Sequence, residues 1–233
     1  MSNIFQATRE FIMTKYQIDL DTLEPDFRLS DGNTKLAKDG IWSFNLIPIV
    51  HCPMAGACKS YCYATVGQQA FKSGVLRRAR AFLATLSPDF VTSMASEILK
   101  AQKKGMRAIR IHDSGDFYSP EYFAKWVQLA GMFPGIRFYA YTKMIFFVQR
   151  FGKKLPTNLR LIQSLGGIAD DRIDQSLPHS RIFSSLDELL AAGYQDASES
   201  DAPAAFGDSP LIGLVIHGAK SKRFDPTVMQ KGA

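Results

Sequence analysis

The sequence of 233 residues contains few cysteines and no long apolar segment, and these absences exclude several classes of protein. No stretch of about 18 residues is both apolar and free of charge, so the sequence predicts no transmembrane helix. Residues 1–16 carry Arg9, Glu10 and Lys15 among apolar residues, which indicates an amphipathic helix and excludes the unbroken apolar core of a signal peptide. We therefore expect a cytoplasmic protein.

Common nucleotide-binding motifs are also absent. No G-x-G-x-x-G follows the first predicted strand and no G-x-x-x-x-G-K-[ST] occurs, which disfavours dinucleotide-binding and P-loop proteins. The net charge of +6 permits nucleic acid as a partner. The basic residues are nevertheless scattered, and no nucleic-acid-binding motif accompanies them, so we interpret them first as solvated helix faces.

Strand-like runs alternate with helical stretches from residue 43 onward. The six predicted strands are residues 43–50, 107–112, 136–141, 158–165, 181–184 and 211–217. The predicted helices are residues 68–86, 88–104, 120–133, 144–151 and 186–192, with a further helix between the fourth and fifth strands. This alternation predicts an α/β fold with a parallel sheet, either a partial (β/α)6 barrel or an open doubly wound sheet.

The same pattern suggests how the chain is divided. Residues 1–30 are predicted to form an N-terminal helical extension, and residues 31–233 a single β/α domain. Residues 196–208 are rich in Ala, Ser, Asp and Pro, which indicates a loop or an insertion. In both candidate architectures the functional loops follow the carboxyl ends of the strands.

All three cysteines lie within the segment HCPMAGACKSYCYA, residues 51–64, with the spacing C-x5-C-x3-C. An odd number of clustered thiols in a reducing compartment indicates metal binding or redox chemistry rather than disulfides. Thiolates suit zinc and iron–sulfur clusters, and three of them can hold three corners of a cubane cluster and leave the fourth iron open. Ala55, Gly56 and Ala57 keep the loop small. The alternative is three buried cysteines that act as small apolar side chains.

A three-cysteine loop directly after the first strand resembles the radical S-adenosylmethionine (radical SAM) superfamily. Its usual spacing is C-x3-C-x-aromatic-C. Here Tyr61 precedes the third cysteine as that aromatic residue does, but both gaps are longer. The segment Ser114-Gly115-Asp116, after the second strand, is similar to the superfamily's Gly-Gly-Glu segment, which contacts the amino group of SAM.

The resemblance implies a (β/α)6 partial barrel of radical SAM type. Cys52, Cys58 and Cys62 would bind a 4Fe-4S cluster whose open iron chelates SAM. An electron donor would then drive cleavage of SAM to methionine and a 5′-deoxyadenosyl radical. Tyr61 would flank the adenine. The residues expected to contact SAM are Tyr61, Ser114, Gly115, Asp116, Thr142, Ser164, Gly166 and Gly167.

Over about residues 30–220 the chain resembles the phage gene product 88 family. The segments that carry this resemblance are NTKLAK (33–38), CPMAGACKSYCYA (52–64), IHDSGDF (111–117) and YAYTK (139–143). A phage origin would place the protein in the host cytoplasm. Two alternatives stay open at this point. Zinc could bind the three thiolates with His51, His112 or His217, or the chain could be a non-catalytic phage protein that binds nucleic acid.

Overall fold

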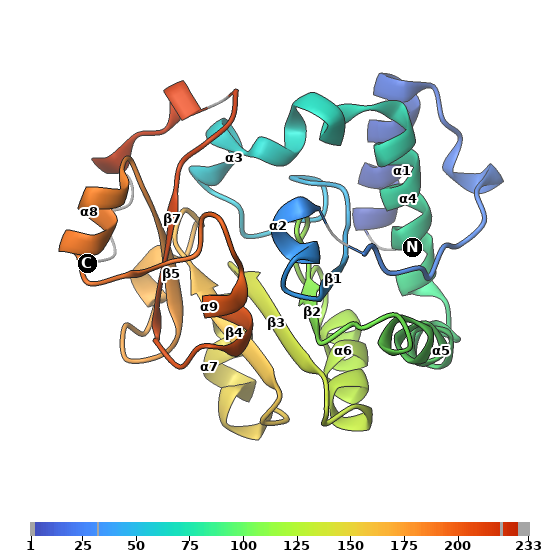
Figure 1. The fold of residues 1–233 in the computed structure, drawn as a ribbon. Coiled ribbons are helices and arrows are strands. Elements are labelled where there is room, and N and C mark those ends of the chain that lie inside the picture. Colours follow the sequence, from blue (N-terminus) through green and yellow to red (C-terminus); the bar gives the residue numbers. More distant parts are fainter. Residues whose placement is uncertain (1–2, 32, 220, 228–233) are drawn as a thin grey trace.

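The computed structural model describes residues 3–31, 33–219 and 221–227, and its central feature is a curved parallel sheet (Figure 1). The strands are β1 Ile41–Phe44, β2 Ala108–Ile111, β3 Arg137–Thr142, β4 Leu159–Ser164, β5 His179–Phe183, β6 Gln195–Asp196 and β7 Leu211–Val215. Their order in the sheet is β1-β2-β3-β4-β5-β7-β6, and each described pair is parallel. The predicted α/β class and parallel partial barrel are confirmed, as a seven-stranded half-barrel.

Helices cover both faces of this sheet. They are α1 Asn3–Tyr16, α2 Thr34–Ala37, α3 Cys58–Tyr61, α4 Lys72–Leu86, α5 Phe90–Gln102, α6 Pro120–Met132, α7 Ile145–Phe151, α8 Leu186–Ala191 and α9 Ala202–Phe206. Side chains of α4, α5, α6 and α7 pack on one face, here called the outer face. Side chains of α2 and α9 pack on the other, the inner face. No described helix has the length and apolar character needed to cross a membrane.

The prediction of six strands was wrong by one, because β6 was missed. This strand has only two residues, Gln195 and Asp196, and its place is set by pairing with β7 rather than by any apolar pattern of its own. Residues 196–208 were predicted as a loop or insertion, but they include the helix α9. Ala197 and Ala204 of this segment are fully buried, so it forms part of the inner core.

Two further predictions near the strands need correction. The first strand was predicted over residues 43–50, but β1 ends at Phe44 and a series of turns follows. Pro48 lacks the N–H that a strand ladder requires, and Ile49 has a φ of 69°, which lies outside extended geometry. A helix was also predicted between the fourth and fifth strands, where the structure has only the short 3-10 turn Asp170–Arg172.

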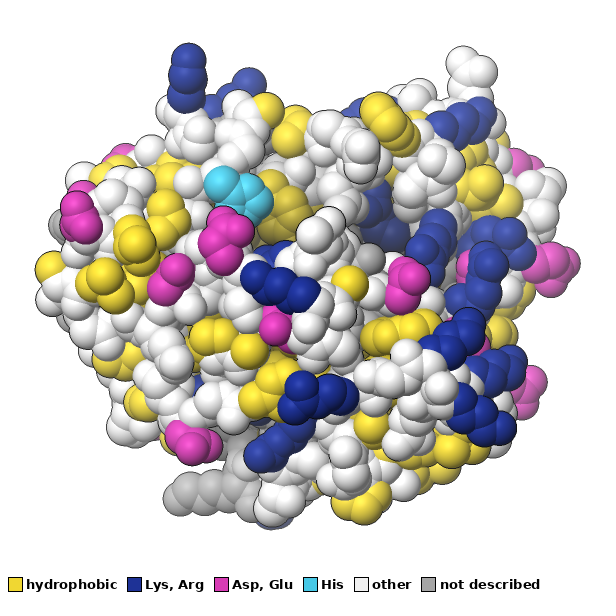
Figure 2. Space-filling model, in the orientation of Figure 1, with side chains coloured by type: hydrophobic (Ala, Val, Ile, Leu, Met, Phe, Trp, Pro, Cys, Tyr) yellow, Lys and Arg dark blue, Asp and Glu magenta, His cyan; other side chains and the backbone are white. Residues whose placement is uncertain are grey.

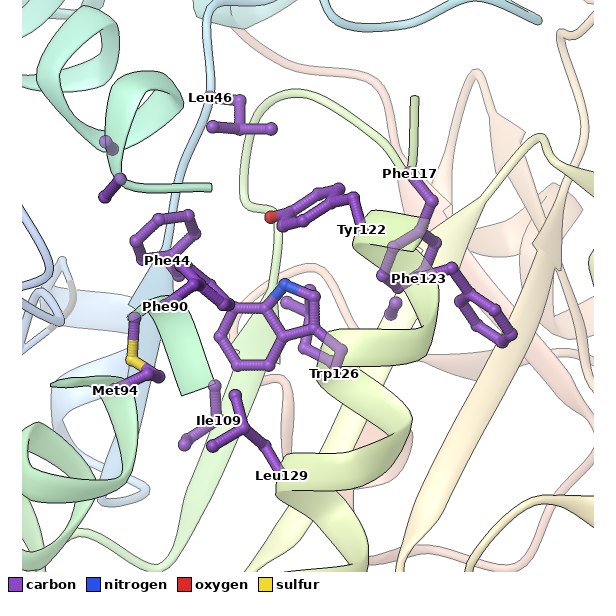
Figure 3. Close-up of a cluster of buried hydrophobic side chains, with 14 of the residues drawn as sticks. Phe44, Leu46, Phe90, Met94, Ile109, Phe117, Tyr122, Phe123, Trp126 and Leu129 are labelled. Carbon is purple, nitrogen blue, oxygen red and sulfur yellow. The ribbon is translucent and has the colours of Figure 1, made fainter. Parts of the chain in front are cut away.

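The outer core is built from aromatic side chains of β1, α5 and α6 (Figure 3). Ser119 caps α6 by accepting a hydrogen bond from the Tyr122 N–H, and Pro120 occupies the first turn, as the sequence predicts. The helix thereby directs Trp126, which is fully buried, toward Phe44 and Phe90, with ring centroids 5.5 and 5.6 Å away. This core holds the first strands on their outer face, and the loops follow the carboxyl ends of these strands.

Candidate functional site

The cysteine loop, residues 52–62, is hydrogen-bonded to the segment that follows β4. The N–H groups of Gly56 and Cys58 both donate to the Gly166 carbonyl at 3.1 Å, and the Ile168 N–H donates to the Met54 carbonyl at 3.0 Å. The loop begins eight residues after β1, so these bonds connect two separate strand ends. The structure therefore places the cysteines and Gly166 on one rim, as the sequence predicts.

Gly56 shows why this loop needs a residue without a side chain. A Cβ at this position would lie 2.6 Å from the Gly167 carbonyl oxygen and 2.7 Å from its carbon. A side chain at this position would force the backbone to shift, because the colliding atoms are main-chain atoms of Gly167. The small residue is thus required by the close approach of two loops, a more specific reason than the general compactness inferred from the sequence.

The three thiols influence one another. Cys58 begins the helix α3 and Cys62 follows its last residue, Tyr61. Burial, together with the nearby Asp116, Cys58 and Cys62, raises the pKa of the Cys52 thiol to about 12. A bound metal would supply the positive charge that stabilises the thiolates, so metal binding at these residues would release protons.

The side chains that could bind a metal are not gathered around one point in the part of the chain that the structure describes. Across the described ranges, no group of three or more histidine, cysteine, aspartate or glutamate side chains is arranged to hold one metal ion. In a tetrahedral zinc site with Zn–S bonds of about 2.3 Å, the sulfur atoms lie only about 3.8 Å apart. A four-iron cluster is larger, so its cysteine ligands lie farther apart. The described residues therefore show no assembled metal centre, and cluster binding by the three cysteines stays a prediction.

Of the three histidines that could complete a zinc site, two are buried and hydrogen-bonded and one is exposed. His51 is fully buried, with Nδ1 accepting from the Ile47 N–H and Nε2 paired with the Thr8 hydroxyl. His112 pairs through Nε2 with the Tyr122 hydroxyl. Burial lowers the pKa of both rings to about 3, so they are neutral near pH 7. The exposed His217 lies beside the Tyr63 ring, with 5.8 Å between centroids.

Asp116 links the ends of β2 and β3. Its Oδ1 accepts from the Thr142 hydroxyl at 2.7 Å and the Phe117 N–H at 2.8 Å, and its Oδ2 accepts from the Lys143 N–H at 2.8 Å. Burial raises the pKa of Asp116, although these hydrogen bonds oppose the shift. A carboxylate has about four lone-pair sites, so three are occupied and one is left for another donor.

Ser114 and Gly115 lock this turn against the loop that leads into the cysteines. The Ser114 hydroxyl donates to the Leu46 carbonyl, and the Leu46 N–H donates to the Ser114 carbonyl, each at 2.8 Å. Gly115 has a φ of 94°, and a Cβ there would lie 2.6 Å from the Leu46 Cβ. The segment is thus both a turn, as its composition suggests, and a direct support of the cysteine loop.

The predicted residues after β4 join the same network. Gly166 and Gly167 donate their N–H groups to the Asp170 carboxylate at 2.7 and 2.8 Å. The Ser164 hydroxyl accepts from the Lys143 ammonium at 2.9 Å. Lys143 was not among the predicted site residues, although it ends the YAYTK segment. Its backbone contacts Asp116 and its side chain contacts Ser164, so it connects the carboxyl ends of three strands.

Tyr61 lies at the side of this rim. Its side chain is 5% exposed and packs near Leu165 and edge-on against Phe224, with 5.2 Å between ring centroids. Its buried hydroxyl has no hydrogen-bond partner among the described residues. The ring therefore belongs to a small apolar cluster beside the loop, and its hydroxyl can still accept or donate a bond.

Sequence reasoning missed a second group at this rim. The Tyr63 hydroxyl contacts both the Asp113 carbonyl at 2.6 Å and its carboxylate at 2.7 Å, and the Asp113 N–H donates to the Asn45 side chain at 2.6 Å. A hollow of about 240 Å³ opens beside these residues and is lined by Asn45 and Asp113. A larger one of about 700 Å³ lies between α1, α4 and α6 and meets the cysteine loop only at Pro53.

Comparison with known proteins identifies the family. The model of the Gene product 88 family matches residues 27–226, most of the chain, so the chain belongs to this family. It is 32% identical over 102 residues to the Gene 88 protein of Mycobacterium phage D29, which covers 40% of this chain and 42% of the relative. For the Gene 88 protein of Mycobacterium phage L5 the identity is 33%, over 40% of this chain and 43% of the relative. The chain thus aligns with about two fifths of the length of these curated relatives. No solved structure matches the chain.

Proposed function

We propose that this member of the Gene product 88 family is an iron–sulfur protein of radical SAM type, in which Cys52, Cys58 and Cys62 bind a 4Fe-4S cluster. The observation that carries the proposal is that the cysteine loop and the loop after β4 lie on the same rim of the half-barrel. The loop with all three cysteines lies at the carboxyl ends of a parallel half-barrel and is bonded to Gly166 after β4. Parallel barrels carry their catalytic loops on this rim.

The protein's own groups would prepare the site in two ways. Hydrogen bonds from Gly56 and Cys58 to Gly166 fix the loop before any ligand arrives. The turn at Ser114 and Gly115 supports the start of the loop through Leu46. Because these supports hold the backbone of the loop and of the segment that leads into it, less entropy would be lost when the thiols bind a cluster.

When bound, the cluster would supply one electron to SAM and so cleave it to methionine and a 5′-deoxyadenosyl radical. The remaining lone pair of Asp116 would accept a hydrogen bond from the SAM ammonium, a charge-assisted contact. The Lys143 ammonium, which reaches Ser164, would face the SAM carboxylate. Gly166, Gly167 and Thr142 would shape the pocket around the same amino-acid group.

The test is SAM cleavage by protein reconstituted with iron and sulfide without oxygen and reduced with dithionite. We expect 5′-deoxyadenosine by chromatography and SAM binding by calorimetry. Asp116→Asn should weaken SAM binding by about ten- to hundredfold, the loss expected for one charge-assisted hydrogen bond of about 1.5–3 kcal/mol. It should keep its iron, because Asp116 is not a proposed ligand.

The matched control is Asp171→Asn, which removes an exposed carboxylate near the same rim and should leave SAM binding unchanged. A fully reconstituted protein that neither binds SAM nor forms 5′-deoxyadenosine would overturn the radical SAM assignment.

A further inference from the structure

A basic cleft adjoins the cysteine loop on the side of β1 and α4. It has a volume of about 240 Å³, and its charged and amide lining includes Asp26, Arg28, Asn45, Arg77, Arg78 and Asp113. Figure 2 shows Lys and Arg side chains inside a hollow near the centre of this face and over the elements to its right. The lining therefore brings together segments that are far apart in the sequence.

Each of the two carboxylates that line the cleft is paired with a guanidinium group other than Arg77 and Arg78. Asp26 forms an ion pair with Arg28 at 2.7 Å. Asp113 pairs with Arg110 at 3.3 Å and accepts a hydrogen bond from Tyr63. Within the described part of the chain, neither Arg77 nor Arg78 has a carboxylate at ion-pair distance. The cleft thus contains two guanidinium groups that have no carboxylate of a described residue at ion-pair distance.

Arg78 is the more unusual of the two. It is 5% exposed, and its terminal nitrogens donate to the side chain and carbonyl of Gln69. Its Nε is buried and has no partner among the described residues. Burial lowers the pKa of the guanidinium, because a buried charge is costly, although the nearby Tyr16 and Asp113 oppose the shift. Arg77 is exposed at the edge of the cleft and donates to the Leu29 carbonyl at 3.3 Å.

We propose that this cleft binds a phosphomonoester group of the substrate, with Arg78 at its buried end and Arg77 at its opening. A phosphomonoester carries about −1.5 to −2 charges near pH 7, enough to pair with both Arg77 and Arg78, whereas a carboxylate supplies only one charge. Guanidinium groups also present paired N–H donors that fit phosphate oxygens. The volume is below the range of about 300–1,000 Å³ for whole drug-sized ligands, so the cleft receives one end of a molecule.

The position of the cleft extends the proposed function, on which this inference rests. Asp113 lines the cleft and also binds Tyr63, the residue that follows Cys62. Arg78 lies within electrostatic range of Cys62 and Tyr63. A substrate that is bound through its phosphate would therefore extend its other end toward the cysteine loop, where the reactive group of SAM is expected.

Calorimetry on the full-length reconstituted protein tests this inference with ribose 5-phosphate as the probe and ribose as its uncharged counterpart. We expect ribose 5-phosphate to bind and ribose not to bind. Arg77→Gln and Arg78→Lys should each weaken the phosphate affinity about ten- to hundredfold, as loss of a charge-assisted bond predicts. Arg80→Gln is the matched control, because Arg80 lies on the same helix and donates to the Glu24 carbonyl outside the cleft. It should bind like the wild type.

Three results would overturn the inference. Ribose 5-phosphate could fail to bind. A DNA oligonucleotide with 5′-hydroxyl ends could bind tightly and lose affinity steeply with salt, which would make the cleft part of a polynucleotide surface. Arg78→Lys could lose iron and keep its phosphate affinity, which would make Arg78 a counter-ion of the thiolates. A protein that cleaves SAM but ignores phosphate would refute only this inference, and one that binds phosphate but assembles no cluster would refute only the proposed function.

Discussion

The outer and inner faces of the half-barrel bury different kinds of side chain. On the outer face, Phe44, Ile109 and Phe138 are buried in an apolar core that four helices cover. On the inner face, the four strands β1 to β4 carry charged and hydroxyl groups at adjacent register positions: Ser43, Arg110, Tyr139 and Arg160. The outer face supplies the larger apolar core, whereas the inner face combines a smaller apolar cluster with these polar groups.

Buried polar contacts also connect the inner face to the segment that contains α9. Arg160 donates to the carbonyls of Pro203, Ala204 and Gly207, which fixes the segment containing α9. Asp201 begins this segment and accepts from Arg110 and Tyr139. Closer to the rim, the buried Tyr141 hydroxyl has no hydrogen-bond partner within the described residues. The inner face thus combines paired polar groups with a buried hydroxyl that has no partner among the described residues.

The largest effect on stability is expected on the outer face. Trp126→Ala should lower the free energy of unfolding by about 3–5 kcal/mol, because the fully buried indole fills the space between Phe44 and Phe90. Urea denaturation measures this change. A loss below about 1 kcal/mol would mean that neighbouring side chains fill the space left by the indole. The outer core would then not depend on close packing around Trp126.

A smaller loss is expected for Asp201→Asn, at about 3 kcal/mol, because Arg110 and Lys35 would lose their shared buried carboxylate. Burial disfavours the charge of Asp201, but attraction from Arg110 and Lys35 outweighs it and lowers the pKa. The unfolded chain, with a pKa near about 3.9, takes up its proton first as the pH falls. The wild-type advantage is therefore present above about pH 4 and is lost as the pH falls through the lower folded pKa.

Denaturation of wild type and variant at several pH values measures this advantage. An equal difference between the two proteins at pH 7 and at pH 2 would contradict the buried ion pairs as its source.

The smallest of these changes tests the rim. Gly56→Ala should cost about 1–3 kcal/mol, because its Cβ would collide with the Gly167 carbonyl. It should also reduce iron uptake if the loop must pack closely to position the thiols. Gly135→Ala is the control, since a Cβ there meets no atom within 4 Å and its φ is not positive. Equal stability and iron content in both variants would show that the loop contact is not needed.

Local sequence patterns predicted the parts of the fold that depend on local structure. Ser119 and Pro120 marked the start of α6, and the apolar run at β2 marked a buried strand. The strand β6 carried no such signal, because its pairing with β7 arises only after the chain has folded. The first strand was predicted too far along the chain, because Leu46, Ile47 and Ile49 are apolar although their backbone turns.

The site followed the same division. The cysteine loop and the segment at Ser114 could be placed on one rim, because both follow strands of a parallel sheet. The cleft at Arg78 could not be predicted, since Asn45, Arg78 and Asp113 meet only through tertiary packing. The role of Asp116 in joining two strand ends was also hidden, because a turn residue and a bonded buried carboxylate look alike in sequence.

The iron and sulfide content after anaerobic reconstitution tests most directly whether the three thiols bind one cluster. The wild type should contain about four irons and four sulfides per chain, with broad absorbance in the visible range. Cys52→Ala, Cys58→Ala and Cys62→Ala should each lose most of both, whereas Lys59→Ala, an exposed change in the same loop, should lose neither. Full iron content in the triple cysteine variant, or a colourless wild type that binds one zinc ion, would contradict the claim.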